Sequence, residues 1–174
     1  MSEKPFPELL LIKPLYIEGS GDGTQIVSNE GDSIEDLRGM RSVRTALCRQ
    51  YAVDYPALRK MCIELCGPGI TPLLLAPGYT MIPVKTRTAM FPGDPCHGYV
   101  NLAEVKDIMS IDDGEYKAEL ETNNGSSFKT LTSAKTVTQN LRRAELLQKC
   151  RWPMDVSHLR QRRELVELIL KAFS

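Results

Sequence analysis

The chain has 174 residues, of which 42% are hydrophobic and 25% are charged, and its formal net charge at pH 7 is zero. This length allows one domain or two small ones, and either could bury a sizeable core. No apolar run approaches the roughly 20 residues of a membrane-spanning helix. The acidic start of the chain lacks the pattern of a signal peptide, so we expect a cytoplasmic protein with no membrane partner.

A β-hairpin is predicted first, with strands at residues 9–17 and 24–28. The Gly-Ser-Gly-Asp-Gly segment between them supplies residues that tolerate positive φ in a turn. This segment does not match a phosphate-binding loop, because neither a Lys-Ser/Thr pair nor a helix follows it. We therefore interpret it as the turn of a plain hairpin.

Two helices are predicted next, and we expect them to form a helical hairpin packed on the sheet. Ser33 or Asp36 is expected to cap the first, which reaches about Ala52 because apolar residues recur at spacings of three and four. Its expected buried face comprises Leu37, Met40, Val43, Leu47 and Tyr51. The second helix follows Asp54, a favourable N-cap, and ends at Gly67.

The five cysteines are odd in number and scattered, so we expect reduced and largely buried thiols. Cys62 and Cys66 are four residues apart and share one face of the second predicted helix. Core packing is favoured over metal binding there, because free cysteine is usually buried and no second pair completes a zinc site. No metal or cofactor is predicted.

The centre of the chain is predicted to be extended. Asp-Gly and Asn-Gly turns between its later segments are strong hairpin signals and indicate an antiparallel meander. The near-continuous apolar character of the earlier segments favours a buried sheet position. The predicted strands cover residues 70–76, 79–84, 98–102, 105–111, 115–122 and 126–131.

Helices are predicted again near the end of the chain. Ser133 is expected to cap the first, and Pro153 is expected to end it. Its inward residues are expected to be Val137, Leu141, Ala144 and Leu147. A last helix is predicted from Ser157 to about Phe173, with an apolar stripe made of Leu159, Val166, Ile169, Leu170 and Phe173. Packing of this stripe on the domain is favoured over pairing with a second chain.

These elements predict an α+β fold with antiparallel β-sheets, a meander, a helical hairpin and C-terminal helices. Three segments are expected. Residues 1–78 would hold the β-hairpin and helical hairpin, residues 79–150 the meander and a basic helix, and residues 151–174 the C-terminal helix.

Charge is unevenly distributed along the chain. Residues 125–163 contain nine basic residues but only two acidic ones, Glu145 and Asp155. The acidic excess lies elsewhere, including residues 107–121. One basic face would account for this division and would fit a nucleic-acid partner. An ordinary solvated helix face is the alternative.

Few residues have the arrangement that catalysis requires. His97 and His158 are the only histidines, and neither belongs to a recognised nucleophile motif. Cys96 precedes His97, but neighbouring side chains of an extended segment point apart, so a thiolate–imidazole pair is not expected. We predict no catalytic residue and no enzymatic activity.

Several short motifs occur in a familiar order. The first strand ends in Pro-Leu-Tyr, a helix carries Cys-Arg-Gln-Tyr (48–51), and Tyr-Pro-Ala-Leu-Arg-Lys (55–60) follows. Ile-Pro-Val-Lys-Thr-Arg (82–87) then precedes the meander and a helix containing Leu-Arg-Arg-Ala. Over residues 9–147 this order resembles the competence transcription factor (ComK) family. Gly-Tyr-Val-Asn-Leu and the hairpin after it more weakly resemble LytTR-type DNA-binding domains.

The resemblance implies a transcriptional regulator that binds double-stranded, AT-rich DNA largely through the minor groove, as a dimer or higher homo-oligomer. The chain departs from the family at residues 82–87, where the family has Phe-Pro-Thr-x-Ser-Pro. The change alters the loop and adds a charge, so the family's DNA sequence preference does not carry over.

The first candidate DNA-binding residues lie around the fourth and fifth predicted strands. Lys85 and Arg87 flank the hydroxyl of Thr86, an arrangement suited to phosphate contact or entry into a narrow groove. Tyr99 and Asn101 alternate on a strand, and Asn101 could bind a base edge. Sheet packing for Tyr99 and turn formation for Asn101 are the alternatives.

Further candidates lie on the basic helix. Ser133 and Lys135 are placed where a helix N-terminus could bind phosphate, and Arg142 and Arg143 follow about two turns later. Residues 79–150 are therefore the expected DNA-binding region. We expect a two-sided contact, with residues 85–87 at one end and this helix at the other. The alternative function is a non-enzymatic protein-interaction or ligand-sensing module that lacks DNA binding.

Overall fold

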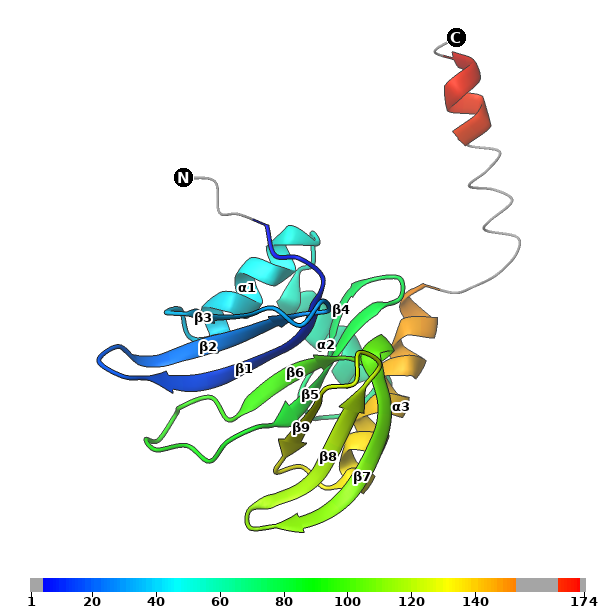
Figure 1. Ribbon diagram of the computed structural model, residues 1–174. Coiled ribbons are helices and arrows are strands. Elements are labelled where there is room, and N and C mark those ends of the chain that lie inside the picture. Colours follow the sequence, from blue (N-terminus) through cyan, green and yellow to red (C-terminus); the bar gives the residue numbers. More distant parts are fainter. Residues whose placement is uncertain (1–4, 153–165, 173–174) are drawn as a thin grey trace.

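A computed structural model describes residues 5–152 and 166–172 (Figure 1). The strands are β1 (Leu9–Ile17), β2 (Gly21–Ser28), β3 (Ser33–Asp36), β4 (Leu73–Ala76), β5 (Tyr79–Lys85), β6 (His97–Asn101), β7 (Val105–Asp113), β8 (Tyr116–Thr122) and β9 (Ser127–Thr130). The helices are α1 (Met40–Gln50), α2 (Tyr55–Cys66), the short 3-10 helix η1 (Leu102–Glu104) and α3 (Ala134–Arg151).

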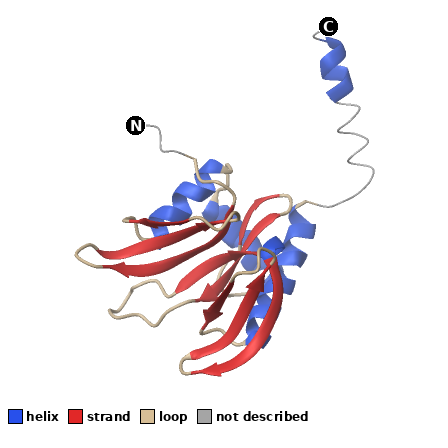
Figure 2. Ribbon diagram, viewed as in Figure 1, coloured by secondary structure: helices blue, strands red, loops and turns tan. Residues whose placement is uncertain are grey.

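The strands form two antiparallel sheets, against which α1, α2 and α3 pack (Figure 2). The larger sheet has the order β3-β2-β1-β6-β5-β4, and the smaller is the meander β7-β8-β9. The predicted α+β class with antiparallel sheets is therefore confirmed. Strands from both sides of residue 78 share the larger sheet, since β6 lies between β1 and β5.

The larger sheet is apolar on both faces, and a β-bulge in β1 allows that strand to place leucine side chains on each of them. Leu9 pairs with Ser28 and Leu11 with Val27, so Leu10 is an extra residue in the ladder. Because side chains of a strand alternate, one extra residue resets the alternation. Leu9 and Ile12 consequently join the core that α1 and α2 cover, whereas Leu10 and Leu11 join the core shared with the meander and α3.

The predicted start of the first helix is wrong. Ser33 and Asp36 cap no helix; they bound the edge strand β3, which pairs with β2. The Asp36 carboxylate accepts hydrogen bonds from the backbone N–H and the guanidinium of Arg38, which turns the chain before α1 begins at Met40. Leu37, expected on the buried face, is 69% exposed.

The second helix begins as predicted. The Asp54 carboxylate accepts a hydrogen bond from the Ala57 N–H at 3.1 Å, and Gly67 is the C-cap. Leu58 and Cys62 are buried against the sheet, and Cys66 is half-buried. Within the described residues, no group of three or more His, Cys, Asp or Glu side chains is placed to hold a metal ion.

Helix α3 runs antiparallel along β5. The Asn140 side chain donates to the Pro83 carbonyl at 3.3 Å, and Gln148 donates to the Thr80 hydroxyl at 2.6 Å. The predicted cap is confirmed, because Ser133 Oγ accepts a hydrogen bond from the Thr136 N–H. The buried residues of α3 are Val137, Ala144 and Leu147.

Residues 166–172 are helical. Val166, Ile169 and Leu170 are exposed, so the expected packing of their stripe on the domain is not observed for these three. Ser157, Leu159 and Phe173, which were assigned to the same helix, lie outside the described residues. None of the described helices is long and apolar enough to cross a membrane.

Candidate nucleic-acid interface

The end of β5 is joined directly to the loop that precedes α3. The Lys85 N–H donates to Thr132 Oγ1 at 2.8 Å, and the Lys85 carbonyl accepts from the Leu131 N–H at 2.9 Å and from Thr130 Oγ1 at 2.7 Å. Lys85 and the start of α3 were expected at opposite ends of the interface, but they are neighbours. The two basic parts therefore meet at one end of the molecule.

Three exposed cations form a row along the outer face of α3. Lys135, Arg142 and Lys149 are seven residues apart, which is about two turns or 10.5 Å per step. We call these three residues the α3 basic stripe. They lie opposite the buried Val137 and Ala144, and none of them forms an ion pair with any described residue.

Lys149 was not among the predicted site residues. The signal that could have found it is the seven-residue spacing itself, which repeats twice after Lys135. Glu145 is the one acidic residue of α3, whereas five of its residues are basic. The outer face of this helix is therefore positive over most of its length.

Arg87 is engaged inside the protein. Its guanidinium stacks over the Tyr16 ring at 3.9 Å, pairs with Asp22 and donates from Nε to the Pro95 carbonyl at 2.8 Å. The side chain is only 11% exposed. Arg87 thus fixes the loop between β5 and β6 to the β1–β2 hairpin, and these contacts leave it little capacity for DNA.

Further contacts hold the same loop in place. The Tyr16 hydroxyl donates to Asp94 Oδ2 at 2.6 Å, and burial together with this hydrogen bond raises the pKa of Tyr16. The Thr86 N–H donates to the Cys96 carbonyl at 2.8 Å, which closes the base of the loop. Thr86 itself is half-buried. The loop is thereby given a defined path away from the sheet.

The tip of this loop presents two apolar side chains to solvent. Met90 is 66% exposed and Phe91 is 63% exposed. The Met90 N–H donates to the Tyr16 hydroxyl at 2.8 Å, so the backbone beneath them is held. Sequence reasoning missed both residues; the adjoining Met-Phe-Pro-Gly turn was their only signal.

Tyr99 and Asn101 face the interior. Tyr99 is 4% exposed and belongs to the core beneath α1 and α2. Asn101 is fully buried; its Nδ2 donates to the Leu9 carbonyl at 3.1 Å, and its Oδ1 accepts from the Ala103 N–H to cap η1. Sheet packing and turn formation, the alternatives weighed for these residues, are the roles that the structure gives them.

Ser133 and Arg143 are also occupied by structural contacts. The Ser133 hydroxyl caps its own helix, as described above. Arg143 donates from Nη2 to the Gly67 carbonyl at 2.9 Å, at the C-terminal end of α2 where a cation is favourable. A side chain at Gly69 would collide with Arg143, because an added Cβ would lie 2.4 Å from Nη1. Arg143 therefore joins α2 to α3.

Two lysines of the meander form ion pairs, so they are not free to bind phosphate. Lys106 pairs with Glu121 at 2.8 Å, and Lys129 pairs with Asp113 at 2.5 Å. Lys129 is one of the nine basic residues counted in the sequence, so the positive surface is narrower than that count indicates. Among the described residues within 125–163, the exposed cations without ion pairs are those of the α3 basic stripe.

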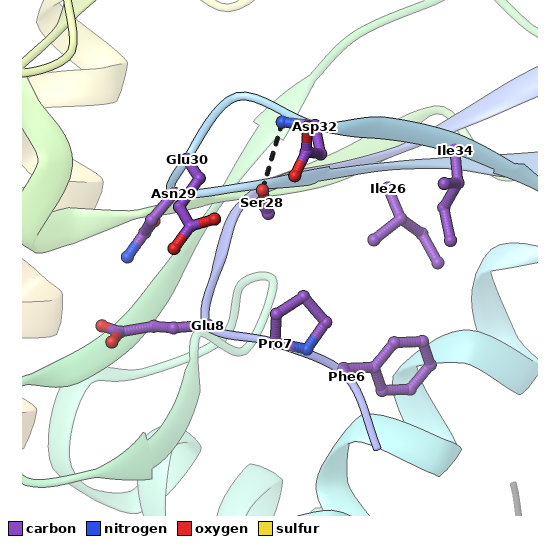
Figure 3. A pocket seen from close by; sticks show the side chains of 9 residues that line it. All are labelled: Phe6, Pro7, Glu8, Ile26, Ser28, Asn29, Glu30, Asp32 and Ile34. Carbon is purple, nitrogen blue, oxygen red and sulfur yellow. Dashed lines mark hydrogen bonds between the residues drawn. The ribbon is translucent and has the colours of Figure 1, made fainter. Parts of the chain in front are cut away.

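A separate hollow of about 310 Å³ lies between the N-terminal segment and the turn joining β2 to β3 (Figure 3). The side chains of Glu8, Glu30 and Asp32 lie on one side of it, and those of Phe6, Ile26 and Ile34 lie on the other. Carboxylates repel phosphate, so this part of the surface is excluded from the candidate interface. The apolar part is lined by Phe6, Pro7, Ile26 and Ile34.

Comparison with known proteins adds no assignment, since no family model, curated protein or solved structure matches the chain.

Proposed function

We propose that the protein is a non-enzymatic, DNA-binding transcriptional regulator of the ComK type, which contacts the backbone of AT-rich duplex DNA. The observation that carries the proposal is the α3 basic stripe, Lys135, Arg142 and Lys149. These cations are exposed, regularly spaced and without ion-pair partners among the described residues. The motif order resembling the ComK family supports the same class of partner.

The spacing of the stripe suits a phosphate backbone. From Lys135 to Lys149 the helix rises about 21 Å, a length comparable to the major and minor grooves of B-DNA taken together. Phosphate contacts fix the position and orientation of a protein on the duplex without reading its sequence. The stripe therefore supplies affinity. Lys85 is joined through its backbone to the loop before α3, and its side chain lies on the sheet face of His97.

Met90 and Phe91 give the proposed interface an apolar element. Proteins that bind the minor groove often insert apolar side chains between base steps and bend the duplex. The loop that carries these two residues leaves β5 directly after Lys85, so it lies at the same end of β5 as the start of α3 (Figure 1). We assign Met90 and Phe91 to contact with the groove.

The remaining predicted residues have supporting roles in this proposal. Arg87 and Thr86 hold the loop whose tip enters the groove, and Arg143 holds α3 against α2. Tyr99 and Asn101 build the sheet beneath. The AT-rich preference rests on the family resemblance and on the ease with which flexible TA steps deform.

Fluorescence anisotropy of the full chain with labelled AT-rich and GC-rich duplexes tests the proposal. At about 50 mM salt the AT-rich duplex should bind more tightly, and the affinity should fall steeply by about 200 mM salt because bound counterions are released. Absence of binding at the lower salt concentration would refute the proposed function.

A further inference from the structure

A second hollow lies between α1 and β6, on the side of the larger sheet that α1 and α2 cover. Its volume is about 410 Å³, within the range of roughly 300 to 1,000 Å³ that is usual for small-molecule sites. It is lined by Met40, Arg41, Arg44, Ile70, Pro95, Cys96, His97 and Tyr99. None of these lining residues is acidic, in contrast to the hollow of Figure 3.

The charge of this hollow is positive. Arg41 is exposed, Arg44 is half-buried, and neither guanidinium forms an ion pair within the described part of the chain. Lys85 adds to the local charge, because it is the cross-strand partner of His97. Burial, and secondarily the charge of Lys85, lower the pKa of His97. At neutral pH its imidazole is therefore neutral and can donate one hydrogen bond.

Arg44 is held in position before any ligand arrives. Its guanidinium lies over the Tyr55 ring at 4.1 Å, and Nη1 donates to the Tyr55 hydroxyl at 3.3 Å. Burial raises the pKa of the neighbouring Tyr99 hydroxyl to about 12, and Tyr55 and Arg44 both act on it electrostatically. A guanidinium carries five donors in a fixed plane, and an ordered one loses less entropy on binding than a mobile side chain.

The beginning of α1 contributes to the same environment. Its N-cap is Gly39, which provides no side-chain hydrogen bond, and its first turn contains no acidic residue. Met40 and Arg41, the first two helical residues, line the hollow. The positive end of the helix dipole and the N–H groups of the first turn therefore favour negative charge there.

Apolar atoms complete the lining. Met40, Ile70 and Pro95 face the same space as the two arginines, so a ligand with a small apolar body would bury part of its surface against them. We infer that the hollow between α1 and β6 binds a small organic anion, with a phosphate or carboxylate group held by Arg41 and Arg44 and an apolar body against Met40, Ile70 and Pro95.

This site is separate from the proposed DNA contact. α1 covers the core formed with Leu9 and Ile12, whereas the start of α3 lies beside the core formed with Leu10 and Leu11. Two features link them. Lys85 adds charge beside His97 and is joined through its backbone to the loop before α3. Pro95 lines the hollow and accepts the hydrogen bond from Arg87 that fixes the loop carrying Met90 and Phe91. A bound anion would consequently contact the base of that loop.

Isothermal titration of the full chain with phenyl phosphate, benzoate and inorganic phosphate tests the inference. Phenyl phosphate or benzoate should bind, and phenyl phosphate should bind about tenfold more tightly than inorganic phosphate because its ring buries apolar surface. Arg41→Gln should weaken binding by about tenfold or more, since a hydrogen bond to a charged group is lost. The matched control is Arg49→Gln, on the same helix outside this hollow, and it should leave the affinity unchanged.

Arg44→Lys provides a second variant that keeps the charge and removes the planar donor fork. It should weaken binding several-fold, while its circular dichroism spectrum matches that of the unaltered protein. Amide chemical shifts should change around Arg41, Arg44 and His97 when phenyl phosphate is added. Absence of binding by both organic anions at millimolar concentration, or equal binding by the Arg41→Gln variant, would overturn the inference.

Measuring the DNA affinity of the same variant distinguishes failure of this inference from failure of the proposed function. Arg41→Gln should leave the affinity for AT-rich duplex unchanged. If the variant lost DNA affinity and the unaltered protein bound no organic anion, the hollow would belong to the DNA surface and the inference would fail while the proposed function stood. If phenyl phosphate bound and DNA did not, the inference would stand and the proposed function would fail.

Discussion

Lys85 and Thr132 are 47 residues apart in sequence, yet the Lys85 N–H donates a hydrogen bond of 2.8 Å to the Thr132 hydroxyl. This contact fixes the end of β5 to the loop before α3. It brings Lys85 beside the beginning of the α3 basic stripe and starts the loop of Met90 and Phe91 from the same place. The proposed interface depends on this connection more than on any single charge.

Neutralising the α3 basic stripe should weaken DNA binding and flatten its salt dependence. In the variant Lys135→Gln, Arg142→Gln, Lys149→Gln, the slope of log affinity against log salt should fall by about three units per bound monomer, because each lost phosphate contact removes nearly one unit. Anisotropy titrations at several salt concentrations give the slope. The control Arg49→Gln, Arg59→Gln, Lys60→Gln removes three exposed cations from α1 and α2, and an equal effect there would remove the stripe from the interface.

Phe91→Ala should lower DNA affinity through a different mechanism. Loss of an apolar contact should weaken binding to the AT-rich duplex by about tenfold and leave the salt slope unchanged, since no phosphate contact is removed. Phe91 is exposed, so the folded protein should retain its stability. Unchanged affinity of the Phe91→Ala variant for the AT-rich duplex would argue against insertion of the loop tip into the groove.

Arg87 should prove important for stability. Replacing it with Ala removes the Tyr16 stacking and leaves Asp22 without its partner, which should lower the free energy of unfolding by about 2 to 4 kcal/mol. Urea denaturation measures this loss, and Arg49→Ala should cost less than about 0.5 kcal/mol. Arg87→Lys, which keeps the charge but not the planar stack, should be intermediate in stability. If Arg87→Lys kept full stability and lost DNA affinity, Arg87 would be a direct contact instead.

His97 should make the protein less stable in mild acid. Its pKa is lowered in the folded state by burial and by Lys85, so below the ordinary histidine pKa the unfolded chain binds the proton more readily than the folded one. The free energy of unfolding should therefore fall as the pH decreases from 7 through the ordinary value near 6.5. In His97→Gln the difference between pH 7 and pH 5 should be smaller, and chemical denaturation at both pH values measures it. An identical pH dependence in the two proteins would contradict this assignment.

Much of the local structure could be predicted from the sequence because its causes are local. The Asp-Gly and Asn-Gly turns of the meander, the Asp54 and Ser133 caps, and the inward residues of α3 each depend on neighbours within one or two turns of chain. The prediction of a helix cap at Ser33 or Asp36 was wrong because the structure of residues 33–36 has a non-local cause. Four residues carry too little pattern to separate a helix start from an edge strand, and pairing with β2 decided the outcome.

Site residues were harder to predict, because their partners are distant in sequence. Asn101 is held by the carbonyl of Leu9, 92 residues away, and Arg87 is held by Asp22, 65 residues away. A sequence pattern records the chemistry of such side chains but not whether that chemistry is already used inside the protein. The same holds for Arg143, which the Gly67 carbonyl engages.

By itself, the sequence determined the class of fold, the turns and caps, the apolar faces and the concentration of positive charge toward α3. The tertiary structure alone decided which cations face solvent, because burial and pairing depend on contacts between distant segments. It made Arg87 and Arg143 structural, left Lys135, Arg142 and Lys149 exposed, and placed Lys85 beside them through the hydrogen bond to Thr132.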